Sequence, residues 1–131
     1  MSKSAIYAAN TAVQTIAAAG TTINFGSIVR RFGCLDLSGG NVITNCEGYY
    51  SVDTNFTVRG SGNGTVIIQL YSNGVAIPGA VATTTTATGS INSLSIPTEI
   101  RQKCCVSETI TAVASGAVAD ITNAAIVVAK D

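Results

Sequence analysis

The residues of this sequence best suited to chemistry are its four cysteines, because thiolates bind metals and form disulfides. They are Cys34, Cys46, Cys104 and Cys105. None of them forms a Cys-x-x-Cys pair, no histidine completes a mixed zinc site, and two adjacent cysteines chelate poorly. Three interpretations stay open: small semi-buried strand residues, which the sequence favours most, disulfides within or between subunits, and a metal site, which it favours least.

The other reactive residues form no recognisable catalytic pattern. The lack of histidine removes the commonest general base near neutral pH. No Gly-x-Ser-x-Gly elbow occurs, and the glycine-rich segment 60–64 lacks the lysine of a phosphate-binding loop. The carboxylates are scattered: Asp36, Glu47, Asp53, Glu99, Glu108, Asp120 and Asp131. We therefore expect a protein that is not an enzyme, with no catalytic, metal-binding or cofactor-binding residues.

Composition points to self-association. The formal net charge is zero and only 11% of the residues are charged, against about 25% in ordinary soluble domains. A neutral chain has no global field to attract nucleic acid or an anionic membrane. Of the 131 residues, 47% are hydrophobic. A single domain of this composition has too few polar residues to cover its apolar surface. We expect symmetric copies of the chain to hide part of that surface.

The sequence shows no targeting or membrane segment that we recognise. Polar residues interrupt the Ala-rich N-terminal stretch, so it does not resemble a signal peptide. The apolar run 124–129 is far too short to cross a bilayer. We expect synthesis in a cytoplasm without a signal peptide.

Alternating apolar residues and turn signals predict an all-β protein. The predicted strands are 5–9, 12–17, 22–25, 28–32, 41–45, 49–59, 64–72, 75–82, 90–96, 106–115 and 120–129. Glycine-containing turns separate most of them, and the Thr-rich segment 82–89 is predicted to be a loop. Many short strands at regular spacing are typical of a sandwich or barrel.

Three strands carry most of the information about packing. Asn73-Gly74 predicts a type I′ hairpin turn, and Pro78 places the return strand at a sheet edge. The core face of that hairpin is predicted to hold Val66, Ile68, Leu70, Val75 and Ile77. Strand 49–59 alternates cleanly, with Tyr50, Val52, Thr54, Phe56 and Val58 on one face. The last strand is apolar on both faces, so we expect another subunit to cover one of them.

The segments GYYSV (48–52), VIIQLYSNGVAIPGA (66–80), ETITAVASG and DITNAAIVVAK resemble the jelly-roll domains of the complement/tumour-necrosis-factor-like superfamily, in particular the small bacteriophage and bacterial versions. The resemblance implies a jelly-roll β-sandwich of about ten antiparallel strands that assembles as a homotrimer. It covers residues 22–130. The predicted jelly-roll domain is 22–131, with residues 1–21 as an N-terminal arm or first strands.

The resemblance further implies a structural virion protein, a capsid decoration or head-fibre protein that is made in the bacterial host cytoplasm. Its expected partners are copies of itself and the major capsid protein or another virion protein. The alternative is a module that binds a glycan or host surface through loops 60–64 and 82–89. The predicted trimer-interface residues are Tyr49, Ile67, Tyr71, Ile126 and Val128.

Overall fold

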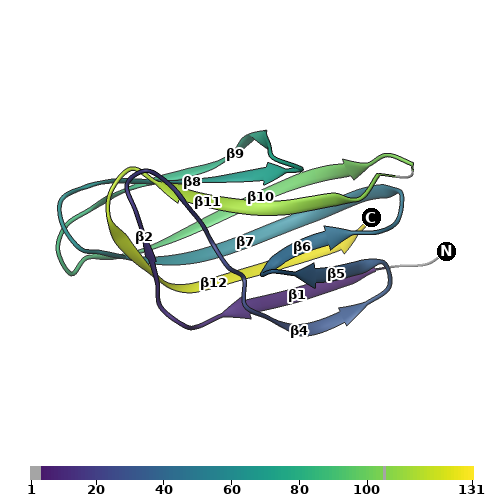
Figure 1. Ribbon diagram of the computed structural model, residues 1–131, viewed down its shortest axis with the longest axis horizontal. Helices are drawn as coiled ribbons and strands as arrows, with labels where there is room; N and C mark the ends of the chain where they lie inside the picture. The colour runs from purple at the N-terminus through teal and green to yellow at the C-terminus, as the bar shows by residue number, and fades with distance from the viewer. Residues whose placement is uncertain (1–3, 105) are drawn as a thin grey trace.

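The computed structural model describes residues 4–104 and 106–131 and shows two antiparallel β-sheets stacked face to face (Figure 1). Sheet A has the strand order β10-β7-β12-β1-β4, and β2 extends it by pairing with β12. Sheet B has the order β5-β6-β11-β8-β9, and β3 pairs with β11. The described residues thus form twelve strands and no helix, so none of them forms a helix that could cross a membrane. The predicted all-β jelly roll is confirmed.

Each sheet contains six strands. Sheet A consists of β1 (Ala5–Asn10), β2 (Gln14–Ile16), β4 (Ser27–Phe32), β7 (Gly48–Gly60), β10 (Ile91–Gln102) and β12 (Ala119–Lys130). Sheet B consists of β3 (Thr21–Thr22), β5 (Leu35–Ser38), β6 (Asn41–Thr44), β8 (Gly64–Ser72), β9 (Val75–Thr86) and β11 (Glu108–Ser115). Strand β5 is not among the strands predicted from the sequence.

The N-terminal segment belongs to the sandwich. Strand β1 lies between β12 and β4 and pairs with both of them. Strand β2 continues along β12, where Ala119 pairs with Ile16. No boundary therefore separates the described part of residues 1–21 from the jelly roll, because its first strand is an inner strand of sheet A.

The Thr-rich segment 82–89 is largely strand, which corrects the predicted loop. Thr83 pairs with Ile67 and Thr85 pairs with Thr65, so β9 runs to Thr86 before the chain turns into β10. Threonine is β-branched and suits a pleated surface, and its hydroxyl tolerates water on the outer side. The polarity of the segment indicated a loop, but its β-propensity decides the conformation.

The predicted hairpin forms with one irregularity. Asn73 and Gly74 have φ values of +49° and +78°, as a type I′ turn requires, and Tyr71 pairs with Ala76. Beyond that pair the register shifts, because residues 77–80 bulge out of β9 at the sheet edge. The Gln69 side-chain amide donates to the carbonyls of Ile77 and Ala80 at 2.9 and 3.1 Å and stabilises the bulge.

The two strands of the hairpin differ in how far their residues reach the core. Val66, Ile68 and Leu70 are fully buried, as predicted. Val75 was predicted to join them but is 70% exposed, and Ile77 is only partly buried. The return strand therefore contributes less to the core than a regular hairpin would.

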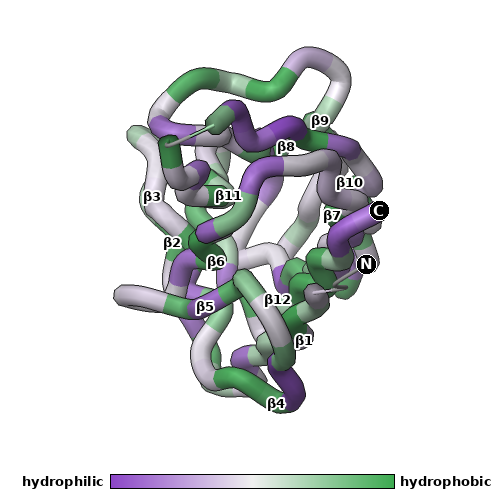
Figure 2. Tube along the Cα trace, turned by 90° about the vertical axis from the view of Figure 1, so that its right-hand side faces the viewer, coloured by the Kyte–Doolittle hydropathy of each residue, from purple (hydrophilic) through white to green (hydrophobic). Residues whose placement is uncertain are grey.

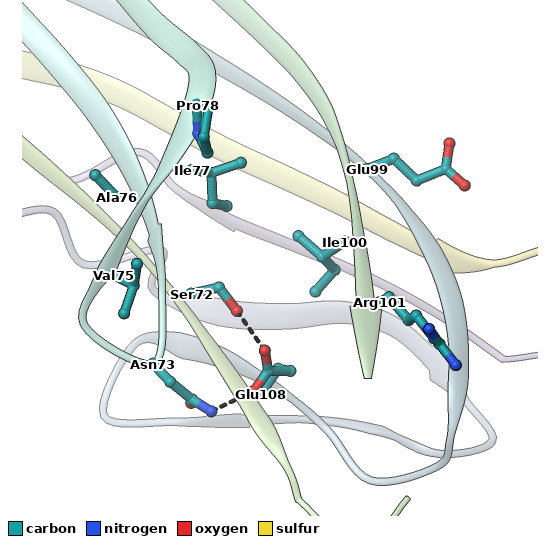
Figure 3. Close-up of a pocket in the computed structure, with 10 residues that line it drawn as sticks. All are labelled: Ser72, Asn73, Val75, Ala76, Ile77, Pro78, Glu99, Ile100, Arg101 and Glu108. Carbon is teal, nitrogen blue, oxygen red and sulfur yellow. Dashed lines mark hydrogen bonds between the residues drawn. The ribbon is translucent and has the colours of Figure 1, made fainter. Parts of the chain in front are cut away.

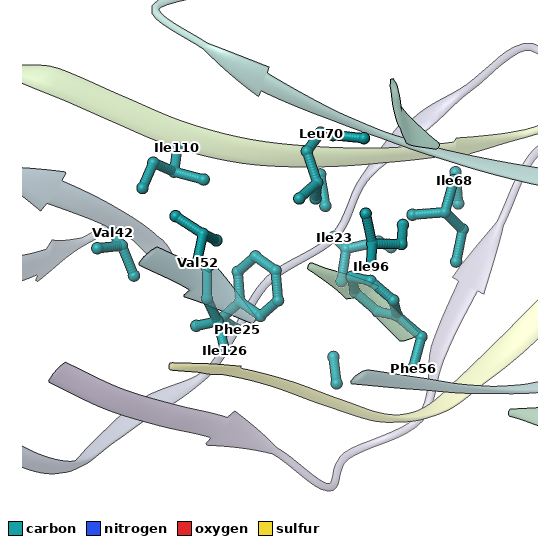
Figure 4. Close-up of a cluster of buried hydrophobic side chains, with 14 of the residues drawn as sticks. Ile23, Phe25, Val42, Val52, Phe56, Ile68, Leu70, Ile96, Ile110 and Ile126 are labelled. Carbon is teal, nitrogen blue, oxygen red and sulfur yellow. The ribbon is translucent and has the colours of Figure 1, made fainter. Parts of the chain in front are cut away.

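The core fills the space between the two sheets (Figure 4). All five inward residues of β7 predicted from its alternation are at most 2% exposed. Phe56 packs against Phe25 with ring centroids 5.8 Å apart, a separation favourable for aromatic pairs. The one polar member of the row, Thr54, donates its hydroxyl hydrogen to the carbonyl of Ile96 at 2.9 Å, so it carries no unpaired donor into the core.

Replacing Ile126 by alanine tests which face of β12 is core. Ile126 is fully buried and Ile91 is 69% exposed. We expect Ile126→Ala to lower the free energy of unfolding by about 2–5 kcal/mol, because it opens a cavity between the sheets. Ile91→Ala removes the same atoms from a solvated site and should change it by less than about 0.5 kcal/mol. Chemical denaturation measures both, and equal effects would contradict this assignment of the core.

Candidate assembly surface

The five predicted interface residues lie on three different surfaces. Ile126 and Val128 are fully buried between the sheets of a single chain, so their assignment to a subunit interface is wrong. They pair with Thr54 and Val52 of β7, whose side chains point inward, and therefore share the inward face. The outward face of β12 carries the other set of apolar residues.

The remaining predicted residues do not come together. Tyr49 is 54% exposed and lies on the outer face of sheet A at the start of β7. Ile67 and Tyr71 alternate with the buried residues of β8 and so face outward from sheet B, on the opposite side of the molecule. One flat interface cannot contain all three residues.

The outer face of sheet A contains an uncharged apolar patch over its β1 and β12 strands. Tyr7 pairs with Val127, and these side chains are 39% and 42% exposed. Alanines flank the pair on both strands, and Phe32 of β4, which is 57% exposed, pairs with Ala5. Figure 2 shows the hydrophobic character of these neighbouring strands. We call this patch the β1–β12 face; it consists of Ala5, Tyr7, Ala9, Phe32, Ala125, Val127 and Ala129.

Polar residues surround the β1–β12 face. The outward residues of β7 beside it are Ser51, Asp53, Asn55 and Thr57. On the opposite side Arg30 of β4 pairs with Tyr7. An apolar centre with a polar rim is the usual anatomy of a protein–protein interface.

A buttressed ion pair closes one end of the same sheet face. The Arg59 guanidinium donates to the Asp120 carboxylate at 2.7 Å, and the Thr15 hydroxyl donates to it at 3.0 Å. These two hydrogen bonds, with the Arg59 charge, lower the pKa of Asp120. The pair joins β7, β12 and β2 where β2 extends the sheet.

Acidic and aromatic side chains mark the other end. The Glu99 carboxyl hydrogen bonds with Asp131, and this contact and the like charge raise the pKa of Glu99. The Ser51 hydroxyl donates to Asp131 at 2.8 Å. Next to them the Arg101 guanidinium lies 5.5 Å from the centre of the Tyr49 ring, within the range of a cation–π contact. Tyr49 therefore belongs to the polar end of this face.

The outer face of sheet B differs in chemistry from the β1–β12 face. Its central residues Ile67 and Tyr71 are interspersed with threonines of β8, β9 and β11. The exposed members include Thr65, Thr83 and Thr85. Threonine hydroxyls form hydrogen bonds with water, so this face can stay solvated without charged residues. The β1–β12 face has only the Tyr7 hydroxyl for that purpose.

The structure places two of the four cysteines in a disulfide. Cys34, after β4, is bonded to Cys46, after β6, and the Asn45 amide donates to the Cys34 carbonyl at 2.8 Å. Cys104 is exposed, and Cys105 lies outside the described residues. Among the described residues no three His, Cys, Asp or Glu side chains gather in a way that could hold a metal ion.

The sequence contains a signal for the β1–β12 face. The alternations Ala5-x-Tyr7-x-Ala9 and Ala125-x-Val127-x-Ala129 each place small or apolar residues on one side of a strand. The opposite alternation of the last strand, through Ile126 and Val128, is bulkier and packs in the core. Side-chain volume separates the two faces, because the larger residues fill the space between the sheets.

Comparison with known proteins supports the fold. No protein-family model matches the sequence, and no curated protein matches it. Among solved structures, murine APRIL at pH 5.0 is similar, with 12% identity, a TM-score of 0.69 and coverage of 99% of this chain and 100% of that one. Eiger TNF from S. frugiperda gives 8% identity, a TM-score of 0.70 and coverage of 98% and 91%. The PRD1 vertex protein P5 gives 16% identity, a TM-score of 0.62 and coverage of 97% and 96%.

These similarities define the fold. The chain has the fold of a tumour-necrosis-factor-like jelly roll over nearly its whole length. At such low identities the similarity shows the fold alone, and the function has to be argued from the surface of this chain.

The Asp120 ion pair makes the stability of the fold depend on pH in the acid range. Because the pKa of Asp120 is lowered in the folded protein from its ordinary 3.8, its carboxylate stabilises the fold above pH 3.8. That stabilisation is lost as the pH falls below 3.8 towards the folded pKa. We expect Asp120→Asn to flatten the decrease in Tm between about pH 5 and about pH 2, measured by circular dichroism.

The matched control for this prediction is Asp36→Asn. Asp36 is exposed and forms no ion pair among the described residues. The control should leave the acid dependence of Tm close to that of the unmodified chain. If Asp120→Asn and Asp36→Asn give the same profile, the ion pair does not carry the effect.

Proposed function

We propose that three copies of the chain associate through their β1–β12 faces and that the trimer is a non-catalytic structural protein on the surface of a bacteriophage virion. The observation that carries the proposal is this uncharged apolar face with its polar rim, in a chain with only 11% charged residues. The homotrimer is the assembly implied by the resemblance to tumour-necrosis-factor-like jelly rolls.

Burying the apolar area of this face favours association. A single chain exposes 6406 Å², and a standard interface removes about 800 Å² from each partner. Burial of apolar area stabilises the complex by about 25 cal/mol per Å². The loss of entropy on association opposes this gain. Alanines and a central Tyr7–Val127 pair make a flat surface that another subunit can approach closely.

The virion role rests on different support. The segments that resemble small bacteriophage jelly rolls span most of the chain, and one similar structure is named a vertex protein. In this role the trimer binds the major capsid protein and stabilises the shell as a decoration or head-fibre protein. We propose no catalytic step, since the sequence has no histidine and no recognisable catalytic motif.

A second candidate is binding of a glycan or host surface at the end of the sandwich opposite the start of β1. Two turns meet there: the Gly89 amide donates to the Gly60 carbonyl, and the Gly60 amide donates to the Ser90 carbonyl, both at 2.9 Å. The joined turns present hydroxyl and amide groups of the kind that hydrogen bond sugars. A glycan array probed with the assembled protein tests this candidate, and the lack of any specific binding would reject it.

Placing a charge on the β1–β12 face should dissociate the trimer. Val127→Glu is solvated in the single chain, where the side chain is 42% exposed, but would be buried without a partner on association. We expect size-exclusion chromatography with light scattering to give three times 13.2 kDa for the unmodified protein and 13.2 kDa for the variant.

The control carries the same charge on the opposite sheet. Ile67 is 38% exposed on the outer face of sheet B, so Ile67→Glu should leave the trimer intact. An unmodified protein that stays a single copy at high concentration would contradict the proposal. If Ile67→Glu dissociates the trimer and Val127→Glu does not, the interface lies on the outer face of sheet B instead.

The virion role predicts that the protein is a component of purified particles. Cryo-electron microscopy of the source particle should show density with the shape of this trimer on the shell, at positions with threefold symmetry. Particles that lack the protein should release their contents at a lower temperature, as a fluorescent nucleic-acid dye would report. Absence of the protein from purified particles would reject the role but not the trimer.

A further inference from the structure

A hollow of about 380 Å³ opens between the first residues of β9 and the last residues of β10. Figure 3 shows Ile77 of β9 and Ile100 of β10 pointing towards each other across it. The remaining lining residues are Ser72, Asn73, Val75, Ala76, Pro78, Glu99, Arg101 and Glu108. The β9 wall is therefore apolar, and the other lining residues are polar or charged except for Ile100.

One carboxylate occupies the polar end of the hollow. Glu108 accepts a hydrogen bond from the Ser72 hydroxyl at 3.0 Å and another from the Asn73 side-chain amide. Both donors are neutral. The ion pair found among the described residues joins Arg59 to Asp120, so no Lys or Arg described in the structure neutralises Glu108. Glu108 thus presents a carboxylate that forms no ion pair with a described Lys or Arg.

The Glu108 carboxylate is held in place by a rigid turn. Asn73 donates its side-chain amide to the Ser107 carbonyl at 2.9 Å, and its side-chain oxygen accepts from the Thr109 amide at 2.8 Å. Its main-chain amide also donates to the Thr109 carbonyl at 2.9 Å. These bonds fix the β8–β9 turn against the start of β11, so the acceptor is oriented before any ligand arrives.

The charged residues on the β10 side point elsewhere. Glu99 and Arg101 pair with Ser51 and Tyr49 and share the outer face of sheet A with them. Figure 3 shows both side chains directed away from the hollow, while Ile100 between them points in. Ile77 and Ile100 therefore form an apolar passage that leads to the Glu108 carboxylate, while Glu99 and Arg101 line the rim on the β10 side.

The backbone of β9 is unsuited to adding a strand here. Pro78 has no amide hydrogen, and the carbonyls of Ile77 and Ala80 already accept from Gln69. A ligand has to be recognised by side-chain chemistry. An apolar stem of several methylene groups with a terminal ammonium group matches both the walls and the carboxylate.

We propose that this hollow binds the side chain of a lysine presented by a partner protein. The four methylene groups of the lysine lie between Ile77 and Ile100, and its ammonium group pairs with Glu108. The site is built within one chain, so it doesn't depend on the proposed trimer or on a virion role. Charge-assisted hydrogen bonding to an oriented carboxylate supplies the selectivity for a cation.

Titration with a minimal probe tests the site. The protein is labelled at its isoleucine δ1 methyl groups and titrated with N-acetyl-lysine methylamide while methyl NMR spectra are recorded. We expect saturable shifts of Ile77 and Ile100 with a Kd of about 1–10 mM, weakened by added salt. The same titration with the uncharged norleucine analogue should give at least a tenfold weaker response.

Three variants sharpen the result. Glu108→Gln keeps an acceptor for Ser72 and Asn73 but removes the charge, and should weaken lysine binding at least tenfold. Asp36→Asn removes a charge from an exposed residue that does not line the hollow and should leave binding unchanged. Val75→Lys places an ammonium group at the exposed rim, where it competes for Glu108 and should block the probe. The melting temperature of each variant confirms folding.

Four results would overturn the proposal. The first is the absence of shifts at saturating probe, and the second is equal binding of the norleucine analogue, which would make the hollow merely apolar. The third is unchanged lysine binding by folded Glu108→Gln. Equal or tighter binding of the arginine analogue would reject a site specific for lysine. A failure of trimer formation would change the measured mass and leave the titration interpretable.

Discussion

The structure depends on one constraint: each strand has two faces, and the partner sheet can bury only one of them. In β7 the constraint is met simply, because its outward residues are polar. In β12 both alternations are apolar, and the bulkier one, with Ile126 and Val128, fills the core. The smaller one, with Val127 between two alanines, is left on the surface beside Tyr7. The low content of charged residues in the whole chain thus appears on the surface as one uncharged patch, the β1–β12 face of sheet A.

The outer faces of the two sheets differ in where their polar groups lie. On sheet B, threonines on three neighbouring strands present hydroxyl groups to water, so exposed residues such as Ile67 are surrounded by hydrogen-bonding groups. On sheet A the polar groups gather at the rim, where Arg59 and Asp120 close one end and Tyr49 with Arg101 closes the other. Polar groups spread over a face keep it wet, whereas polar groups confined to its edge leave a dry centre.

Much of the fold can be read from the sequence because alternation and turn chemistry are local signals. The inward row of β7 and the Asn73-Gly74 turn follow from them directly. Other features depend on contacts between distant residues. The bulge at residues 77–80 needs the Gln69 amide of the neighbouring strand, and the short β5 gains its strand character by pairing with β6. The choice between the two apolar faces of β12 follows from side-chain volume, which a binary pattern of apolar and polar residues does not record.

The same bulge also explains why the chain has a hollow at all. A regular hairpin would pair Ile77 with Leu70 and carry it into the core opposite β8, so that the edges of the two sheets could close over it. Because residues 77–80 leave the ladder, Ile77 is only partly buried and faces Ile100 across open space. The gap leaves the Glu108 carboxylate open to water or to a cation, which a closed edge would exclude. A local departure from regular pairing, stabilised by one glutamine, therefore makes both the cavity and the charge within it compatible with a stable sandwich.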